Sequence, residues 1–415
     1  MKDNKPASTE LMALENKYGA HNYHPLPVVL DRGEGVFVWD VEGKKYYDFL
    51  SAYSAVNQGH CHPKIINTLV EQAQKLTLTS RAFYNSRLGE YERFVTEYFG
   101  YEKVLPMNTG AEAVETALKL CRKWAYEKKG LPENTAQIVV CENNFHGRTT
   151  TIVSFSVDPD AYTNYGPYTP GFIVIPYNDV AAFEKVLYEN NNIAGFLVEP
   201  IQGEAGAYVP DDGFLKECYE LCNQHNVLFI ADEVQTGIAR TGKLLACDYE
   251  NVHPDILILG KALSGGAYPV SAVLSSVEIM DVFHPGQHGS TFGGNPLAAA
   301  VAISALEVIK DENLADNAFL LGEIFRDELR MVCNNSRIAS FVRGKGLLNA
   351  LVINNEGHKN LAWDICLKLL ENGLLAKPTH TNIIRFAPPL VITKEQLLDC
   401  VEIIRNTIQT FEMIS

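Results

Sequence analysis

Short apolar runs alternate with segments of helical periodicity through the middle of the chain. Five short apolar runs predict strands, at residues 138–140, 172–175, 195–198, 227–231 and 256–259, and the last two are expected to be buried. Apolar residues between them recur at helical spacing, as at Ala113, Val114, Ala117 and Leu118. From about residue 61 to 310, this alternation predicts an α/β fold with a mostly parallel central sheet flanked by helices.

The pattern changes toward both ends of the chain. Residues 36–39 and 45–48 alternate around the Glu42-Gly43 turn signal and predict an antiparallel ribbon. Beyond about residue 311 the order becomes helix, Gly-rich strand at 342–346, helix, strand and helix. We therefore expect an N-terminal arm and ribbon (1–60), a large α/β domain (61–310) and a small α+β domain (311–415) that packs with the ribbon.

Two of the apolar runs end on opposite charges. Asp232 follows the run at 227–231, and Lys261 follows the run at 256–259 after Gly260. Ligands of open α/β sheets bind outside the carboxyl ends of the strands, so both side chains are expected to face one pocket. Pyridoxal phosphate (PLP) requires a lysine amine and an acidic partner for its pyridine nitrogen. The spacing alone also fits two ordinary strand-end charges.

Other segments carry residues suited to a phosphate or a carboxylate. Thr109 and Gly110 open a helix whose free backbone N–H groups could receive a phosphate. Phe145 offers a stacking plane, and Arg148 offers a fork for a carboxylate, although a buried Phe and a solvated Arg would look the same. Arg385 lies in an apolar strand, where a cation is usually paired or awaits an anion.

Two further loops are rich in polar groups and glycine. The segment 199–206 follows a strand and carries two carboxylates, Glu199 and Glu204, which exceeds what turn chemistry requires. Ser290 and Thr291, in the segment 289–296, add two hydroxyls and are a second plausible phosphate contact.

Charge and cysteine usage narrow the class of protein. A net charge of -15 without a basic run argues against nucleic acid as a partner. Nine scattered cysteines without a C-x-x-C pair fit a reducing compartment better than a disulfide framework. Cys218 and Cys222 are one helical turn apart and are expected in the core rather than in a redox switch.

No metal site or membrane span is expected. The His60-Cys61-His62 segment is flanked by Gly59 and Pro63, which favours a strand-to-helix corner. The longest apolar stretch, 297–309, is interrupted by Ser304 and Glu307. Residues 1–10 show neither a secretory core nor an Arg-rich transit pattern, so we expect a cytosolic location.

Taken together, these segments resemble a known family along nearly the whole chain. The motifs are NTGAEA, NFHGR, EPIQGEAG, FIADEVQTGIARTG, LGKALSGG, HGSTFGGNP and RGKGL. In combination they are similar to those of the class III, fold-type I PLP-dependent aminotransferases. Within that class, residues 18–25, 51–60 and 387–390 resemble members that act on ornithine. The resemblance implies transfer of the δ-amino group of L-ornithine to 2-oxoglutarate, giving glutamate 5-semialdehyde and L-glutamate.

The resemblance also implies roles around the cofactor. Lys261 would bind PLP through its amine and then move protons, and Asp232 would keep the pyridine nitrogen protonated. Gln235 would contact the ring hydroxyl, and Phe145 would stack on the ring. The phosphate would be held by Gly110 and Ala111, joined by Ser290 of the partner subunit and Thr291 of the partner subunit. A homodimer or a higher homo-oligomer follows from this sharing.

For the substrates, the resemblance assigns a second group of residues. Tyr23 and Arg148 would hold the carboxylate and α-amino end of ornithine, and Tyr53 would line the pocket. Arg385 would bind the α-carboxylate of glutamate and 2-oxoglutarate, and Glu204 would neutralise it while ornithine is bound.

One position departs from the ornithine pattern. His146 stands where animal members acting on ornithine are expected to have tryptophan, and Phe-His-Gly is commoner in relatives for acetylornithine and 4-aminobutyrate. Another ω-aminotransferase, for acetylornithine, 4-aminobutyrate or lysine, is therefore the alternative. A PLP-fold binding module without catalysis is disfavoured because Lys261 and Asp232 are both present. An aminomutase is a further, minor alternative, and a requirement for a keto-acid acceptor would exclude it.

Overall fold

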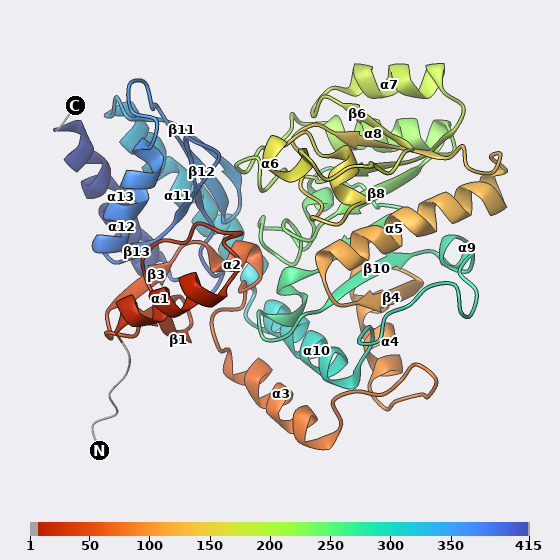
Figure 1. Ribbon diagram of the computed structural model, residues 1–415, viewed down its shortest axis with the longest axis horizontal. Helices are drawn as coiled ribbons and strands as arrows, with labels where there is room; N and C mark the ends of the chain where they lie inside the picture. Colours follow the sequence, from red (N-terminus) through yellow and green to blue (C-terminus); the bar gives the residue numbers. More distant parts are fainter. Residues whose placement is uncertain (1–6, 414–415) are drawn as a thin grey trace.

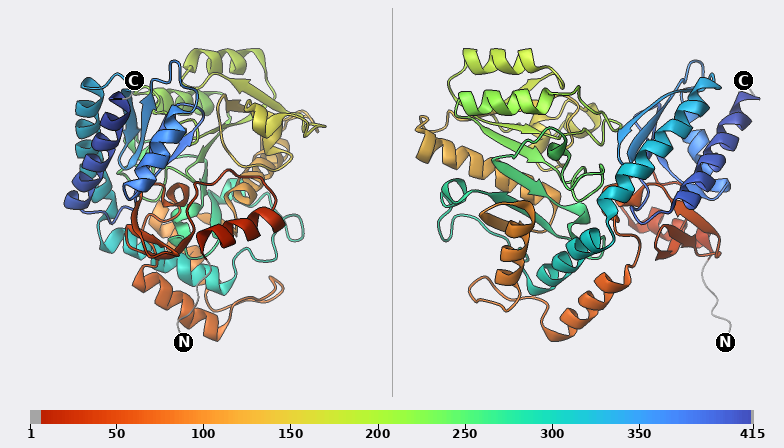
Figure 2. Two further views of the ribbon diagram at one scale, coloured as in Figure 1. Left: turned by 60° about the vertical axis from the view of Figure 1, so that its left-hand side comes forward. Right: turned by 180° about the vertical axis from the view of Figure 1, so that it is seen from behind.

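The fold has two lobes (Figure 1). A computed structural model describes residues 7–413. One lobe is a seven-stranded sheet with helices on both faces, and the other holds two four-stranded sheets with the C-terminal helices. The view from behind shows the same division (Figure 2). The predicted domain boundaries near residues 60 and 310 stay a prediction.

The large sheet is mostly parallel, as the sequence predicts. In spatial order its strands are β4 (Lys103–Met107), β10 (Ser271–Ser275), β9 (Ile256–Leu259), β8 (Leu228–Asp232), β7 (Ile193–Val198), β5 (Gln137–Cys141) and β6 (Phe172–Ile175). Only β10 runs antiparallel to its neighbours β4 and β9. The apolar pattern missed both β4, which contains Pro106, and β10, whose apolar centre is only three residues long between serines.

Alternate residues of the central strands pack on opposite faces of this sheet, because side chains alternate along a strand. Ile138 and Val140 contact the cluster under α5, whereas Val139 belongs to the cluster under α7 and α8. Cys218 and Cys222 are buried in that second cluster, as predicted for core positions. The helices of this lobe are α3 (Pro63–Lys75), α4 (Leu88–Phe99), α5 (Gly110–Trp124), α7 (Val180–Glu189), α8 (Phe214–Gln224), α9 (Val277–Met280) and α10 (Pro296–Asp311).

The second lobe joins the two ends of the chain. One of its sheets has the order β1 (Leu30–Glu34), β2 (Phe37–Asp40), β3 (Lys45–Asp48) and β13 (Leu374–Leu375), so the N-terminal ribbon pairs with a C-terminal strand. The other has the order β11 (Ala339–Lys345), β12 (Leu348–Ile353), β15 (Ile383–Phe386) and β14 (Lys377–Thr379). The long helices are α11 (Leu314–Asn334), α12 (Leu361–Glu371) and α13 (Lys394–Glu412). Phe325 of α11, Phe386 of β15 and Phe49, which follows β3, contact one another and form one aromatic cluster.

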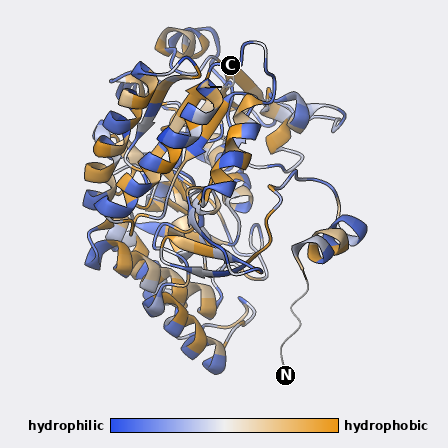
Figure 3. Cartoon of the chain, turned by 90° about the vertical axis from the view of Figure 1, so that its left-hand side faces the viewer, coloured by the Kyte–Doolittle hydropathy of each residue, from blue (hydrophilic) through white to orange (hydrophobic). Residues whose placement is uncertain are grey.

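Short elements complete the fold, namely α2 (Ser51–Ser54), η1 (Ala125–Lys129), η2 (Ile152–Phe155), α6 (Pro159–Tyr162), η3 (Ala246–Tyr249) and η4 (Lys261–Ser264). The N-terminal helix α1 (Ser8–Tyr18) buries no residue and projects from the body of the chain (Figure 3). Its first residue, Ser8, donates hydrogen bonds to the Glu42 carboxylate at 3.0 and 2.6 Å. Within residues 7–413, no helix is long and apolar enough to cross a membrane. The expected cytosolic location rested on residues 1–10, and residues 1–6 lie outside the part of the chain that the structure describes.

Candidate active site

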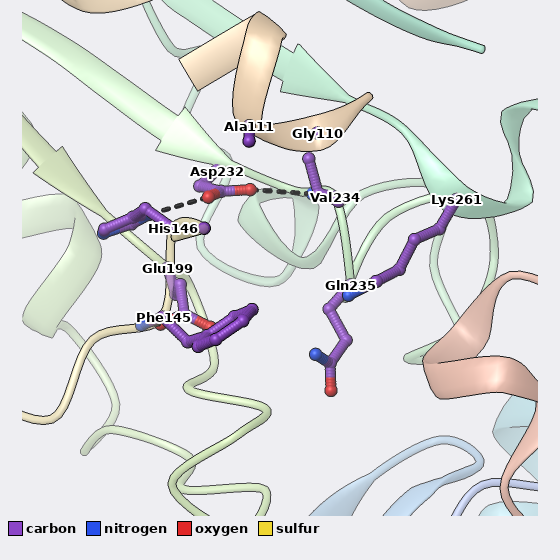
Figure 4. A pocket seen from close by; sticks show the side chains of 10 residues that line it. Gly110, Ala111, Phe145, His146, Glu199, Asp232, Val234, Gln235 and Lys261 are labelled. Carbon is purple, nitrogen blue, oxygen red and sulfur yellow. Dashed lines mark hydrogen bonds and ion pairs between the residues drawn. The ribbon is translucent and has the colours of Figure 1, made fainter. Parts of the chain in front are cut away.

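A cavity lies at the carboxyl ends of β8 and β9, where the sequence places opposite charges. Asp232 is the last residue of β8, and Lys261 opens η4 directly after β9 and Gly260. The cavity has a volume of about 190 Å³ and is lined by Gly110, Ala111, Phe145, His146, Gly147, Glu199, Asp232, Val234, Gln235 and Lys261. A cavity of about 150 Å³ already holds benzene, so this one has room for an aromatic ring. Phe145 and Lys261 reach into it from opposite sides (Figure 4).

The start of α5 forms one wall of this cavity. Thr109 caps the helix: its hydroxyl accepts from the Glu112 N–H at 3.1 Å, while the Glu112 carboxylate accepts from the Thr109 N–H at 3.0 Å. A Cβ atom at Gly110 would lie 3.0 Å from Val234 Cγ1, which is tighter than an ordinary contact, so glycine favours this close approach. The N-terminus of a 15-residue helix presents free N–H groups and a positive dipole end, which suit a phosphate.

His146 is a site residue that the sequence analysis did not select. Its Nδ1 lies 2.6 Å from Asp232 Oδ2, and its side chain is fully buried. Burial opposes protonation, but the hydrogen bond and charge of Asp232 together raise the pKa of His146. The other Asp232 oxygen accepts from the Val234 N–H at 3.1 Å. Asp232 is thus oriented by two contacts, and the Phe-His-Gly departure was the signal that could have revealed one of them.

Glu199 is the second residue that sequence reasoning did not assign to the site. It is the first residue after β7, and it accepts hydrogen bonds from the N–H groups of Phe145 at 2.8 Å and Gly203 at 3.3 Å. Burial raises the pKa of Glu199 to about 7, with the charge of Asp232 contributing in the same direction. Glu199 therefore holds the backbone of Phe145 and borders the cavity beside a second acid.

Lys261 has the properties of a buried nucleophilic amine. Burial lowers its pKa, and the nearby charges of Asp232 and Glu204 only partly offset this effect. Among the described residues, no hydrogen bond or ion pair involves its amine. A larger neutral fraction makes the amine a better nucleophile toward an aldehyde. With an acid at the opposite wall and a helix N-terminus for an anion, the residues present fit PLP.

Arg385 and Glu204 meet beside this cavity, although 181 residues separate them. Arg385 Nη1 lies 2.7 Å from Glu204 Oε2, and Nη2 lies 3.3 Å from Oε1. The Arg385 side chain is 4% exposed and that of Glu204 is 34% exposed, so one partner is buried and the other can reach solvent. Arg385 Nη1 also lies 3.4 Å from Gln235 Oε1, which links the pair to the cavity wall.

Three of the predicted substrate residues are placed less closely together. Tyr53 lies with its ring centre 4.8 Å from the Arg385 guanidinium carbon, and Arg148 lies 5.7 Å from the ring centre of Phe145. Tyr23 is 72% exposed and lines a separate, larger cavity that it shares with Tyr53.

Ser290 and Thr291 do not line the cavity of their own chain. The Ser290 hydroxyl accepts from Asn108 Nδ2 at 2.7 Å, next to the α5 N-terminus, and Thr291 is exposed.

Comparison with known proteins also indicates a PLP-binding aminotransferase site. The class-III aminotransferase family matches residues 18–408. This chain belongs to the class III aminotransferases. Such aminotransferases use PLP as their cofactor, in agreement with the donors around this cavity.

Three relatives of this class III aminotransferase are informative. It is 63% identical to the mitochondrial ornithine aminotransferase of Drosophila ananassae over 401 residues, covering 97% of this chain and 91% of that protein. It is 66% identical to the crystal structure of acetylornithine aminotransferase from Elizabethkingia anophelis, with a TM-score of 0.90, covering 98% and 100% of the two chains. The structure of Toxoplasma gondii ornithine aminotransferase is 51% identical, with a TM-score of 0.96, and covers 98% and 95%. PLP partly occupies its active site.

The expected cytosolic location is wrong. It is contradicted by several relatives of this class III aminotransferase, from flies, rat and nematode, that are named mitochondrial. The expectation rested on composition and on a short N-terminal segment.

Proposed function

We propose that this class III aminotransferase moves the δ-amino group of L-ornithine to 2-oxoglutarate, giving glutamate 5-semialdehyde and L-glutamate. The observation that carries the proposal is the Arg385–Glu204 pair at 2.7 Å, beside the cavity that contains Lys261. The fly and Toxoplasma relatives, both named ornithine aminotransferases, support it. Its partners are then small molecules.

Around the cofactor, we assign roles by what each side chain can reach. Lys261 would bind PLP and carry protons, since burial lowers the pKa of its amine. Asp232 would hold a proton on the ring nitrogen, Phe145 would stack on the ring, and Gln235 would contact the ring hydroxyl, because all three line the cavity. The N-terminus of α5 at Gly110 and Ala111 would receive the phosphate. Bound PLP supplies the electron sink that lets an amino group leave its carbon.

Glu204 and Arg385 explain how one pocket accepts two different substrates. Ornithine must present its δ-amine, whereas 2-oxoglutarate must present an α-keto group flanked by a carboxylate. A free Arg385 would attract the α-carboxylate of ornithine and so direct the wrong amine toward Lys261. While Glu204 is paired with the Arg385 guanidinium, the α-carboxylate of ornithine cannot bind there. When the pair opens, the guanidinium becomes available to a carboxylate of the diacid. Because Glu204 is one-third exposed, its carboxylate can turn into solvent when the carboxylate of the diacid replaces it on Arg385.

The far end of ornithine is then held by residues outside the cavity. Tyr23 and Arg148 are assigned to its α-carboxylate and α-amino group, and Tyr53 lines the pocket between them and Arg385. Support comes from Tyr53, which touches Arg385 and shares a second cavity with Tyr23. The exposure of Tyr23 means that the arm must close over bound substrate or be covered by a partner subunit.

We further propose a two-fold homodimer in which Ser290 and Thr291 complete the phosphate site of the neighbouring subunit. Support comes from their position, because both lie outside the cavity of their own chain while Ser290 contacts Asn108 near α5. Equivalent interfaces would make two sites at once. Dilution that separates the subunits should release PLP, and a fully active monomer in sedimentation would contradict this sharing.

Acetylornithine is the second candidate substrate. The Elizabethkingia relative carries that name at 66% identity, and His146 matches the Phe-His-Gly pattern of acetylornithine enzymes. Both substrates share the δ-amine, so Lys261 and Asp232 do not distinguish them. The difference lies at the α-amine, which is charged in ornithine and acylated in acetylornithine.

A substrate panel tests the proposal. Purified protein with PLP and 2-oxoglutarate should convert ornithine to the semialdehyde, with a kcat/KM at least tenfold above that for N-acetylornithine, 4-aminobutyrate or lysine. A reversed order between ornithine and N-acetylornithine would move the assignment to the second candidate. Turnover without a keto-acid acceptor would contradict an aminotransferase altogether.

A further inference from the structure

Four consecutive residues of α2 have left-handed backbone conformations. The φ angles of Ser51, Ala52, Tyr53 and Ser54 are 48°, 46°, 59° and 74°, and none of the four is glycine. Non-glycine residues enter this region singly, as a rule, because Cβ approaches the following carbonyl oxygen. Four in a row persist only where the surrounding structure determines them, and such strain gathers at functional sites.

Asp48 ties the start of this turn to the body of the protein. Its Oδ1 accepts hydrogen bonds from the N–H groups of Leu50 and Ser51, each at 2.9 Å. Its Oδ2 lies 2.7 Å from His60 Nε2. Asp48 is the buried last residue of β3, so the sheet and His60 hold the carboxylate while the carboxylate holds the turn.

The same turn carries Tyr53 to Arg385. The ring centre of Tyr53 lies 4.8 Å from the guanidinium carbon, and Arg385 lies 2.7 Å from Glu204. A cation over an aromatic face is attracted to it, and the ring also restricts how the guanidinium plane can rotate. The edge that Arg385 offers to a carboxylate therefore depends on where the turn places Tyr53.

We propose that Asp48, held by His60, is a positioning residue for substrate recognition. It stabilises the left-handed turn and so keeps Tyr53 against Arg385, which orients the guanidinium for the carboxylate of the diacid substrate. This inference rests on the proposed function of Arg385. Loss of Asp48 should raise the KM for 2-oxoglutarate about fivefold, the size of one cation–π contact, and change kcat less than twofold.

The chain contains a matched control. Asp40 ends the adjacent strand β2, is as buried as Asp48, and accepts from a backbone N–H (Lys44, 2.8 Å) and a side chain (Tyr46, 2.6 Å). Within residues 7–413, the Asp40 side chain forms its hydrogen bonds with Lys44 and Tyr46 and none with α2. Asp40→Ala should lower the melting temperature about as much as Asp48→Ala, and leave the KM for 2-oxoglutarate unchanged.

Glycine offers a rescue that a purely structural role would not predict. Ala52 is exposed, with φ 46° and ψ 45°, so glycine there removes the strain without removing a buried contact. In the Asp48→Ala background, Ala52→Gly should recover at least half of the lost affinity for diacid. The same change in the Asp40→Ala background should alter nothing at Arg385.

The experiment measures glutarate, an unreactive diacid, binding to the PLP-loaded holoenzyme by calorimetry, together with steady-state KM and kcat. The inference expects weaker glutarate binding in Asp48→Ala, recovery with Ala52→Gly, and wild-type binding in Asp40→Ala. Equal losses in the two aspartate variants, or no recovery with glycine, would overturn it. Arg385→Ala separates the two levels: if that variant binds glutarate normally, the proposed role of Arg385 fails. If it loses binding while Asp48→Ala does not, only the positioning inference fails.

Discussion

The cofactor cavity and the Arg385 site differ in how the chain builds them. The cavity lies at the carboxyl ends of β8 and β9, and its central residues Asp232 and Lys261 directly follow buried apolar strands. The Arg385 site brings together β15, the loop after β7 and the turn after β3. The first is buried and contained within one sheet, whereas the second joins two lobes and includes the partly exposed Glu204.

This difference separates chemistry from selection. A sheet end is rigid because every strand beside it is hydrogen-bonded and packed on both faces, which suits groups that must hold a ring and a proton. A contact between lobes can open and close, which suits a site that must accept two substrates in turn. The predictions below test whether substitutions in the two regions have these two distinct effects.

The largest effect is expected at Lys261. Lys261→Ala removes the amine that binds the cofactor and moves protons, so turnover should fall by several orders of magnitude in both half-reactions. Lys129→Ala is the control, because Lys129 is a partly buried lysine and burial also lowers its pKa. Its amine donates hydrogen bonds to the Ile193 and His225 carbonyls, which do not line the cavity. Borohydride reduction of the wild type should label Lys261, and a label on another lysine would contradict the assignment.

Asp232 should give the next largest effect. Asp232→Asn keeps the shape but removes the charge that holds the ring proton, which should lower kcat about 10²-fold or more. Asp255→Asn is the matched control, since Asp255 precedes β9 at the opposite end of the same sheet and binds the Phe229 N–H at 2.7 Å. It should lower stability and spare kcat. Near-normal activity of Asp232→Asn with PLP bound would assign the role elsewhere.

Substitutions in the Arg385 site should affect the two half-reactions unequally. Arg385→Ala should slow the 2-oxoglutarate half-reaction about ten- to a hundredfold, the worth of roughly 1.5–3 kcal/mol for a charge-assisted contact, and largely spare ornithine. Glu204→Ala should improve reaction with glutamate and let ornithine begin to lose its α-amine. Single-turnover spectra measure each half separately. Equal impairment of both halves would remove the distinction between the two regions.

The smallest effect concerns stability rather than turnover. The pKa of Glu199, about 7, lies above its ordinary value of 4.5 because the group is buried. The folded protein therefore retains a proton that the unfolded chain has released, and the stability from this group, full below pH 4.5, is lost as the pH rises through 7. Glu199→Gln should reduce the fall in stability of cofactor-free protein between pH 5 and 8 by about 2–3 kcal/mol. Exposed Glu217→Gln should leave the slope unchanged, and an unchanged slope in Glu199→Gln would contradict the shift.

Several features of the fold and the site were predictable from local pattern. The apolar runs at 172–175 and 256–259 coincide with β6 and β9. β9 is buried throughout because the sheet covers it on both faces, whereas β6 is an edge strand and its Val174 is 38% exposed. Thr109 and Gly110 were predicted to open a helix, and Thr109 is the N-cap of α5. By contrast, β10 was missed because its five residues carry only three apolar side chains, and its burial comes from neighbours on both sides.

The sequence by itself determined the α/β class and the placing of Asp232 and Lys261 at two strand ends, since both follow from hydrophobic periodicity over a few residues. Motif resemblance added Arg385 and Glu204 as a pair, but their 2.7 Å contact exists only because β15 lies beside the loop after β7. The contacts of His146 with Asp232 and of Tyr53 with Arg385 were decided by tertiary structure alone. Local pattern records which residues are buried, whereas contacts between distant segments depend on how the buried surfaces pack.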